Sequence, residues 1–126
     1  MPDVFRSFAR VSAIAPGVLG LTGVETGEVV LGLCEKIRPD AIIAIDSLVS
    51  RKLSRLCRTI QLSDTGITPG GGIAPGRFPL DEQTLHTPVL ALGIPTVVEA
   101  RTLAADLCPN APPEEELPPT SLIVTP

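Results

Sequence analysis

The apolar run AIIAI at 41–45, which Asp46 follows at once, constrains the fold of this chain more than any other feature. Five consecutive apolar residues predict a β-strand that is buried on both faces. Strands of this kind belong to parallel sheets covered by helices, so the run indicates an α/β protein. We expect this strand to end abruptly at Asp46, where the first charged side chain appears.

The segments around this run alternate between strand and helix patterns. Apolar residues recur at helical spacing over 27–37, with Thr26 as the expected N-cap, and Pro39 is expected to end this helix. Two more helices are predicted over 50–58 and over 96–107, the second capped by Thr96. Short apolar or β-branched runs predict further strands at 10–15, 59–62 and 89–92, and a long loop over 63–79. This order of elements supports the α/β class.

The 126 residues suffice for one domain at most, or for a piece of one. We place a partial α/β domain at 1–108 and a tail rich in Pro and Glu at 109–126. The tail is expected to be largely extended or disordered, although the apolar run at 122–124 can dock as an edge strand.

Composition excludes several classes of function. Aromatic residues make up only 2%, too few for a base-stacking nucleic-acid surface, and the net charge of -4 argues against phosphate binding. We expect no membrane span and no secretory signal, and the odd set Cys34, Cys57 and Cys108 suggests reduced thiols in a cytoplasmic protein. With His86 the single histidine, we expect no metal and no cofactor.

Asp46 is the first candidate for chemistry. A carboxylate directly after a buried strand would lie at the carboxyl edge of the sheet, where α/β proteins bind ligands and where acid/base work is suited to it. The structural alternative is that Asp46 caps a following helix, and the pattern alone favours that alternative. The two roles are compatible.

Asp64 is the second candidate, within Asp64-Thr65-Gly66 after the predicted strand at 59–62. This tripeptide resembles the active-site motif of aspartic proteases, in which two aspartates share a proton. Those enzymes are almost entirely β, whereas this chain has clear helical patterns. The structural alternative is an Asx-turn that closes the strand.

Longer motifs give the chain a family resemblance. They are, in order, APGVLGLTGVET at 15–26, RPDAIIAIDS at 38–47, TIQLSDTGI at 59–67 and GIPTVVEA at 93–100. Together these segments resemble the germination protease of endospore-forming bacteria, from about residue 10 to residue 107. Several motifs of eight or more residues in the correct order are far more specific than a single tripeptide.

The resemblance implies a cytoplasmic endopeptidase of the spore core, made as a zymogen, that degrades small acid-soluble spore proteins during germination. It implies a three-layer α/β/α sandwich resembling the hydrogenase-maturation proteases and a homo-oligomeric assembly. It also implies an atypical aspartic protease in which two aspartates act, one of which matches Asp46.

The chain departs from the family pattern in ways that affect activity. The other proposed aspartate belongs to an upstream segment that has no counterpart here, so catalysis would need Asp64 as a substitute. Three hypotheses therefore stay open: an active homologue, a non-catalytic truncated homologue or assembly module, and a homodimeric aspartic protease of the DTG type. An incomplete sandwich would also expose apolar surface, so we expect self-association or instability.

Overall fold

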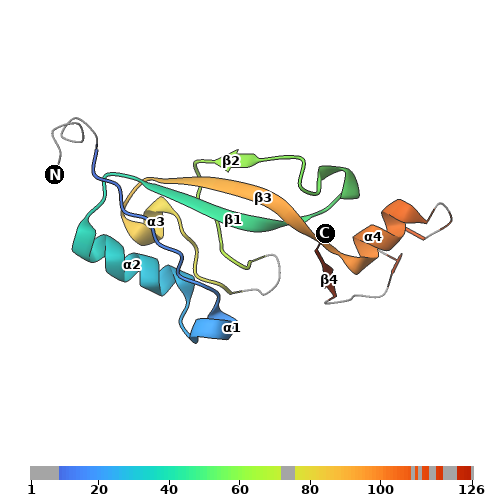
Figure 1. The fold of residues 1–126 in the computed structure, drawn as a ribbon, viewed down its shortest axis with the longest axis horizontal. Helices are drawn as coiled ribbons and strands as arrows, with labels where there is room; N and C mark the ends of the chain where they lie inside the picture. The colour runs from blue at the N-terminus through green and yellow to red at the C-terminus, as the bar shows by residue number, and fades with distance from the viewer. Residues whose placement is uncertain are drawn as a thin grey trace.

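The computed structural model describes residues 9–71, 76–108, 110, 112, 113, 116, 117 and 122–125. Its sheet contains β1 (Ile42–Ser50), β3 (Val89–Glu99) and β2 (Gln61–Ser63) in that order, and a fourth strand, β4 (Ile123–Val124), pairs with β3. The helix α2 (Thr26–Ile37) lies below these strands in Figure 1, and α4 (Ala100–Leu107) lies beyond the end of β3. β1 runs parallel to β3, whereas β2 runs antiparallel to β3. The mixed α/β class predicted from the sequence is confirmed.

The helix α2 (Thr26–Ile37) confirms the predicted helix over 27–37. Its negative residue Glu28 lies in the first turn and Lys36 in the last, where both complement the helix dipole. The N-cap position is occupied by Glu25 rather than Thr26. The helix ends because Arg38 adopts a left-handed conformation with φ 52° directly before Pro39.

The predicted helix over 50–58 is wrong. Ser50 is the last residue of β1, and its hydroxyl donates a hydrogen bond to the Lys52 carbonyl at 2.6 Å, which turns the chain out of the strand. Only the short 3₁₀ turn η2 (Leu53–Arg55) follows. The structure adds two single-turn helices that the sequence did not suggest, α1 (Leu19–Thr22) and α3 (Glu82–Leu85).

One face of the sheet carries the hydrophobic core. Ala44 of β1 and Val89 of β3 pack with Leu85 of α3 and with Leu80, and side chains of α2 pack against this cluster. Side chains alternate along a strand, so Asp46 and Leu48 share the face of Ala44. We call this the covered face.

The opposite face of the sheet contradicts the expectation that 41–45 is buried on both sides. Ile43 and Ile45 point away from the core and are 65% and 69% exposed. The strand at 59–62 is confirmed as β2, shifted toward the chain's C-terminus, and Leu62 on it is also exposed. Within the described residues, the helical layers α2 and α3 therefore cover the sheet on one side only (Figure 1).

β3 corrects two further predictions. The segment Gly93-Ile94-Pro95 is not a turn, and Thr96 caps no helix, because β3 continues to Glu99 and α4 (Ala100–Leu107) begins only there. Pro95 is tolerated because it lies beside the irregularity in the β1–β3 register, where Leu48 pairs with Pro95 and Val49 with Val97.

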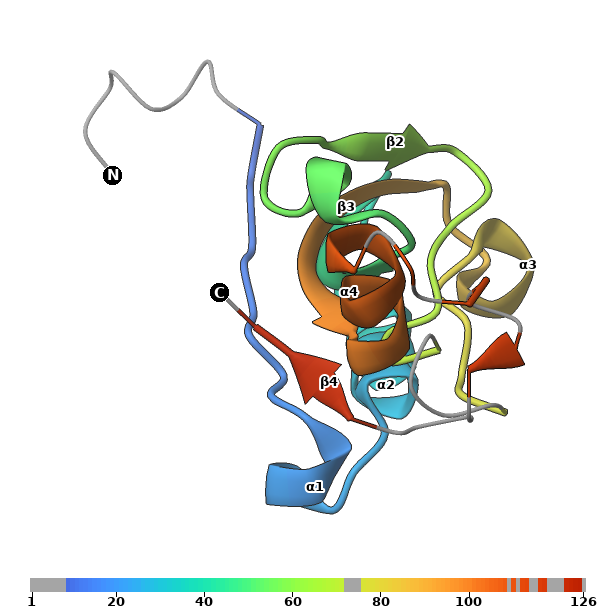
Figure 2. The ribbon, with the colours of Figure 1, turned by 90° about the vertical axis from the view of Figure 1, so that its right-hand side faces the viewer.

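The ends of the chain give one correction and one confirmation. Residues 10–15 form no strand, and Figure 2 shows this exposed segment running apart from β1, β2 and β3. The apolar run at 122–124 does dock, since β4 (Ile123–Val124) pairs antiparallel with the end of β3. Much of the tail at 109–126 lies outside the described residues, so its division from 1–108 stays a prediction.

Candidate functional site

The structure places Asp46 inside β1, not at its end. The strand continues to Ser50 because it pairs with β3 through the whole of that length, and Asp46 is opposite Gly93. Both positional predictions for Asp46, the carboxyl edge of the sheet and the cap of a following helix, are therefore wrong. Its side chain is half-buried on the covered face, just beyond the core residue Ala44.

The carboxylate of Asp46 has no hydrogen-bond or ion-pair partner among the described residues. Neighbouring Ser47 does have one: its hydroxyl is bonded to that of Thr96 on the other face. A carboxylate placed in this way, within reach of a substrate in a cavity, is a candidate for general acid–base chemistry.

A cavity of about 250 Å³ lies next to Asp46 on the covered face. Its lining residues come from all three central strands and from the loop after β2, and they are Leu48, Gln61, Ser63, Gly66, Ile67, Ala91 and Gly93. Asp46 is not itself among them, but its register partner Gly93 and its same-face neighbour Leu48 are. Leu48 leans over Gly93 so closely that a Cβ there would lie 2.3 Å from Leu48 Cδ1.

The turn with Asp64 forms the outer wall of this cavity. The backbone N–H of Thr65 donates to the Ser63 hydroxyl at 3.1 Å, so Ser63 closes the turn and the Asx-turn expected of Asp64 is wrong. Gly66 has φ 86°, and a Cβ at this position would lie 2.3 Å from the Leu80 carbonyl oxygen. Glycine is therefore required for the chain to pass this close to the next segment. The Asp64 side chain is exposed.

The strand register separates Asp46 from Asp64. Asp46 is opposite Gly93, and β2 lies on the far side of β3, with Ser63 opposite Ala91. Two strand spacings and three residues along the sheet put the Cα atoms of the two aspartates about 14 Å apart. Carboxylates that share a proton lie within roughly 3 Å of each other, so these two do not form such a pair.

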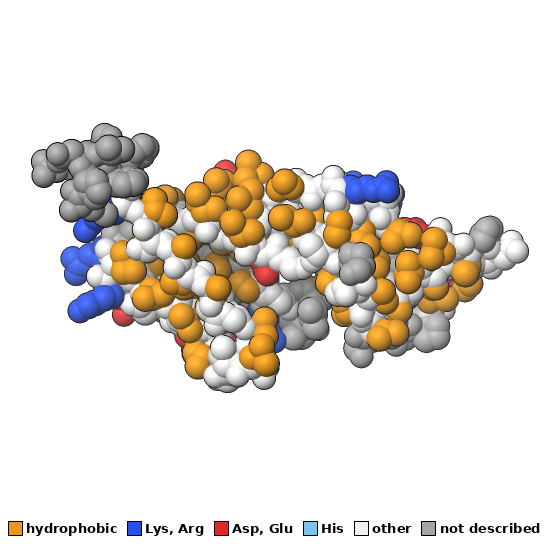
Figure 3. Space-filling model, viewed as in Figure 1, with side chains coloured by type: hydrophobic (Ala, Val, Ile, Leu, Met, Phe, Trp, Pro, Cys, Tyr) orange, Lys and Arg blue, Asp and Glu red, His pale blue; other side chains and the backbone are white. Residues whose placement is uncertain are grey.

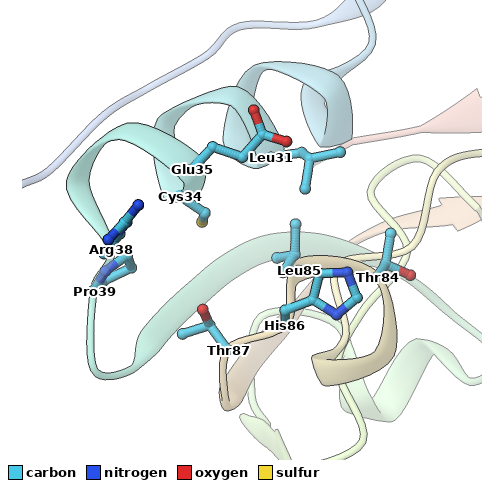
Figure 4. Close-up of a pocket in the computed structure, with 9 residues that line it drawn as sticks. All are labelled: Leu31, Cys34, Glu35, Arg38, Pro39, Thr84, Leu85, His86 and Thr87. Atoms are coloured by element: carbon cyan, nitrogen blue, oxygen red, sulfur yellow. The ribbon is translucent and has the colours of Figure 1, made fainter.

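A second, larger concavity lies elsewhere, between α2 and α3 (Figure 4). This groove of about 550 Å³ is at the amino ends of β1 and β3, since Pro39 and Thr87 line it. Asp81 holds its α3 wall in place by accepting a hydrogen bond from the Thr84 backbone N–H at 2.8 Å, and the hydrogen bonds from Thr84 lower the pKa of Asp81.

Cys34 and His86 approach this groove from opposite walls (Figure 4). Burial raises the pKa of the Cys34 thiol, which favours the inert protonated form over a nucleophilic thiolate. His86 is exposed at the end of α3, as the sequence predicted for a surface position, and no hydrogen bond joins the two side chains. The groove therefore lacks a Cys–His nucleophile.

The described part of the chain contains neither a candidate metal-binding group nor a helix that could span a membrane. No group of three or more His, Cys, Asp or Glu side chains there could hold a metal ion. No helix there is long and apolar enough to cross a membrane.

Comparison with known proteins gives a consistent result. Residues 2–109 match the family model described as germination protease. A germination protease of Clostridium perfringens (strain SM101 / Type A) is 56% identical over 107 residues, which cover 84% of this chain and 33% of the relative. Those of Halalkalibacterium halodurans and Bacillus mycoides (strain KBAB4) are 52% and 50% identical over 104 residues, 82% of this chain and 28% of each relative. The chain thus spans about a third of the length of the curated relatives it matches.

Proposed function

Because this chain belongs to the germination protease family, we propose that it contributes to the hydrolysis of small acid-soluble spore proteins during germination. The observation that carries the proposal is Asp46: a half-buried carboxylate that has no partner among the described residues, beside a cavity, inside the region that matches the family. The resemblance noted from the sequence assigns one of the family's two acting aspartates to this position.

Asp46 acts in this proposal as a general base or acid on the peptide bond. As the carboxylate, it takes a proton from a water molecule that attacks the peptide carbonyl; as the resulting acid, it gives a proton to the departing amine. The cavity lined by Leu48 and Gly93 would hold the peptide next to it.

We propose a separate role for Asp64. Its distance from Asp46 argues against proton sharing, but its exposed side chain on the turn beside the cavity suits contact with the substrate peptide. In this proposal the second catalytic carboxylate belongs to a part of the family's sequence that these 126 residues do not match. The approximately two thirds of the relatives' length that this chain does not cover is its source in this proposal.

Three further expectations remain proposals. We infer that the sheet belongs to an α/β/α sandwich resembling the hydrogenase-maturation proteases, for which the helices on the covered face supply one layer. We propose that the chain acts in the cytoplasm of the spore core, as the resemblance implies. We also propose that it self-associates, because large apolar side chains such as Ile45 are exposed.

A non-catalytic role is the alternative, and one observation favours it: the described chain pairs Asp46 with no second carboxylate. In that case the chain is a truncated homologue or an assembly module that retains the α/β core. The homodimeric DTG-type aspartic protease is less well supported, because α2 and the parallel β1–β3 pair are foreign to an almost entirely β protein.

An experiment with three samples separates these functions. The complement is defined here as the segments of the C. perfringens relative that lie outside the 107 matched residues, produced as polypeptides. We incubate a small acid-soluble spore protein with this chain, with the complement, or with both, and follow its cleavage by gel electrophoresis and mass spectrometry.

We expect cleavage in the mixture and none with either component alone, because only the mixture holds both carboxylates. The intact C. perfringens germination protease serves as the positive control. If it cleaves the substrate while the mixture does not, the chain is not a working part of a protease and the assembly-module alternative is favoured.

A further inference from the structure

Four positive side chains are gathered on the segment that joins β1 to β2. We call this segment the basic loop and define it by its exposed cations, which are Arg51, Lys52, Arg55 and Arg58. Four of the ten Lys and Arg residues of a chain with net charge -4 thus fall within 51–58, and no Asp or Glu occurs anywhere in 47–63. Figure 3 shows positive side chains gathered at the upper right, over the green coil that follows β1 in Figure 1.

The basic loop is not neutralised within the described chain. Arg77 and Arg101 each pair with a glutamate, whereas none of the four loop cations forms an ion pair with a described residue. Asp106 of α4 approaches the loop, but its carboxylate accepts a hydrogen bond from the Leu53 backbone N–H at 2.6 Å rather than from a cation. The positive charges of the loop are therefore available to an external anion.

Backbone hydrogen bonds hold three of these cations in a row. The N–H of Arg55 donates to the Lys52 carbonyl, and the N–H of Arg58 donates to the Arg55 carbonyl, both at 3.1 Å. The first bond belongs to η2, in which three residues advance the chain by about 6 Å. The second closes a type II turn with Leu56 at φ -58° and ψ 122° and Cys57 at φ 52°, and the ends of such a turn lie less than about 7 Å apart. The three cations therefore follow one another in steps of about 6–7 Å.

The basic loop is also fixed to the rest of the fold. Besides the bond from Leu53 to Asp106, the N–H of Cys57 donates to the carbonyl of the buried Pro95 on β3 at 2.7 Å. Leu53 and Leu56 are half-buried, so the apolar side chains of the loop are turned in while its cations stay in solvent. A backbone that is already ordered loses little conformational freedom when a partner binds.

The spacing of the row fits an extended acidic peptide. Alternate side chains of an extended peptide point to the same side and are about 6.6 Å apart. Arginine binds a carboxylate through two parallel hydrogen bonds. We propose that the basic loop is a docking surface for an extended acidic segment of another polypeptide, with Asp or Glu at every second position. This inference goes beyond the proposed function and does not rest on it, because it needs neither Asp46 nor cleavage.

Other anions fit the basic loop less well. A nucleic acid would bring its phosphates to a chain of net charge -4 that has only three aromatic residues on which bases could stack. The chain's own acidic run EEE at 114–116 is another candidate, but its described member Glu116 forms no ion pair with the loop. The same run on a second copy of the chain has its own outcome in the test.

The experiment measures binding of a synthetic peptide to the full chain. A dye-labelled peptide of alternating Glu and Ala residues is titrated with the chain at low and at high ionic strength, and binding is read as fluorescence anisotropy. A single-stranded oligonucleotide of the same charge is titrated in parallel. The variant Arg55→Gln/Arg58→Gln removes two cations of the row, and Arg10→Gln/Lys36→Gln is the matched control, which removes two exposed cations elsewhere.

We expect the wild type and the control to bind the peptide equally, and the loop variant to bind roughly three- to thirtyfold more weakly, the effect of losing two exposed ion pairs. High ionic strength should weaken the binding of the wild type. Circular dichroism should show that the loop variant stays folded, because the turns are held by backbone bonds. If it does not fold, Arg51→Gln/Lys52→Gln repeats the test.

Equal binding by the control and the loop variants, or no binding by the wild type at low ionic strength, would overturn the proposal. Tighter binding of the oligonucleotide than of the peptide would also overturn it. So would a dimer seen by light scattering in the wild type and lost in the loop variant, since a second copy would then be the occupant. Asp46→Asn should bind the peptide as the wild type does, so that this inference and the proposed function fail separately.

Discussion

Replacing Asp46 with Asn should reduce cleavage of a small acid-soluble spore protein by the reconstituted mixture about 10²–10⁴-fold, the usual contribution of general acid–base catalysis. Asparagine has the same shape but cannot take a proton from water. Since Asp46 makes no hydrogen bond in the described chain, the exchange breaks no interaction in the sheet. Binding to the complement and the circular dichroism spectrum should therefore stay unchanged while the cleavage rate falls.

Two matched variants make this result specific to Asp46. Asp40→Asn removes an exposed carboxylate just before β1 and should leave the cleavage rate unchanged. Asp64→Asn should cost less than tenfold, because the strand register keeps Asp64 out of the proton transfer at Asp46. If Asp46→Asn cleaves as fast as Asp40→Asn, Asp46 is not the catalytic carboxylate.

Gly27→Ala should lower the free energy of unfolding of this chain by about 1–3 kcal/mol, the usual cost of overpacking a core. Gly27 is buried on α2, and a Cβ there would lie 2.0, 2.4 and 2.7 Å from the Cδ1, Cγ and Cβ atoms of Phe78. These atoms belong to the aromatic ring of Phe78 and to the carbon that joins the ring to the backbone. Phe78 in turn packs against the core cluster, which limits how far it can move. The ring must therefore move, or the helix must separate from the sheet.

Gly32→Ala on the same helix is the matched control for Gly27→Ala. A Cβ at Gly32 would meet no atom within 4 Å. Alanine there should raise the free energy of unfolding by roughly 0.5–1 kcal/mol, because glycine is the poorer helix former. Urea denaturation followed by circular dichroism measures both variants. Shifts in the same direction would contradict the packing of α2 against Phe78.

The elements that could be predicted from the sequence are those whose signal is local. α2 combines helical spacing of apolar residues with charges that suit both ends and a proline just beyond, and its bounds were predicted to within a residue at the start. The AIIAI run was correctly assigned to a strand for the same reason. The resemblance at 38–47 also singles out Asp46, and the tripeptide Asp64-Thr65-Gly66 singles out Asp64.

The errors occur where pairing between distant segments decides the structure. β1 continues past Asp46 and β3 continues past Pro95 because the two strands pair with each other. This pairing joins segments that are far apart in the sequence, so no local pattern predicts it. The predicted helices over 50–58 and from Thr96 failed for this reason: their first residues belong to strands. The exposure of Ile43 and Ile45 also runs against the sequence, since AIIAI is typical of a strand with cover on both sides.

The surroundings of Asp46 were harder to predict than Asp46 itself. The sequence predicts a turn at Gly93, although a glycine within an apolar run also marks a place where another group comes close, here Leu48. The cavity beside them depends on the antiparallel docking of β2 and on the turn at Gly66, both of which are tertiary features.

The central claim is that Asp46 lies on the covered face of β1 beside the cavity, whereas its neighbour Ile45 points away from the core. Thiol labelling tests this placement most directly. In a background of Cys57→Ser and Cys108→Ser, which removes the exposed cysteines, the adjacent variants Ala44→Cys and Ile45→Cys are treated with a maleimide. The account predicts slow labelling of Ala44→Cys and fast labelling of Ile45→Cys. Equal labelling of the two positions would contradict it.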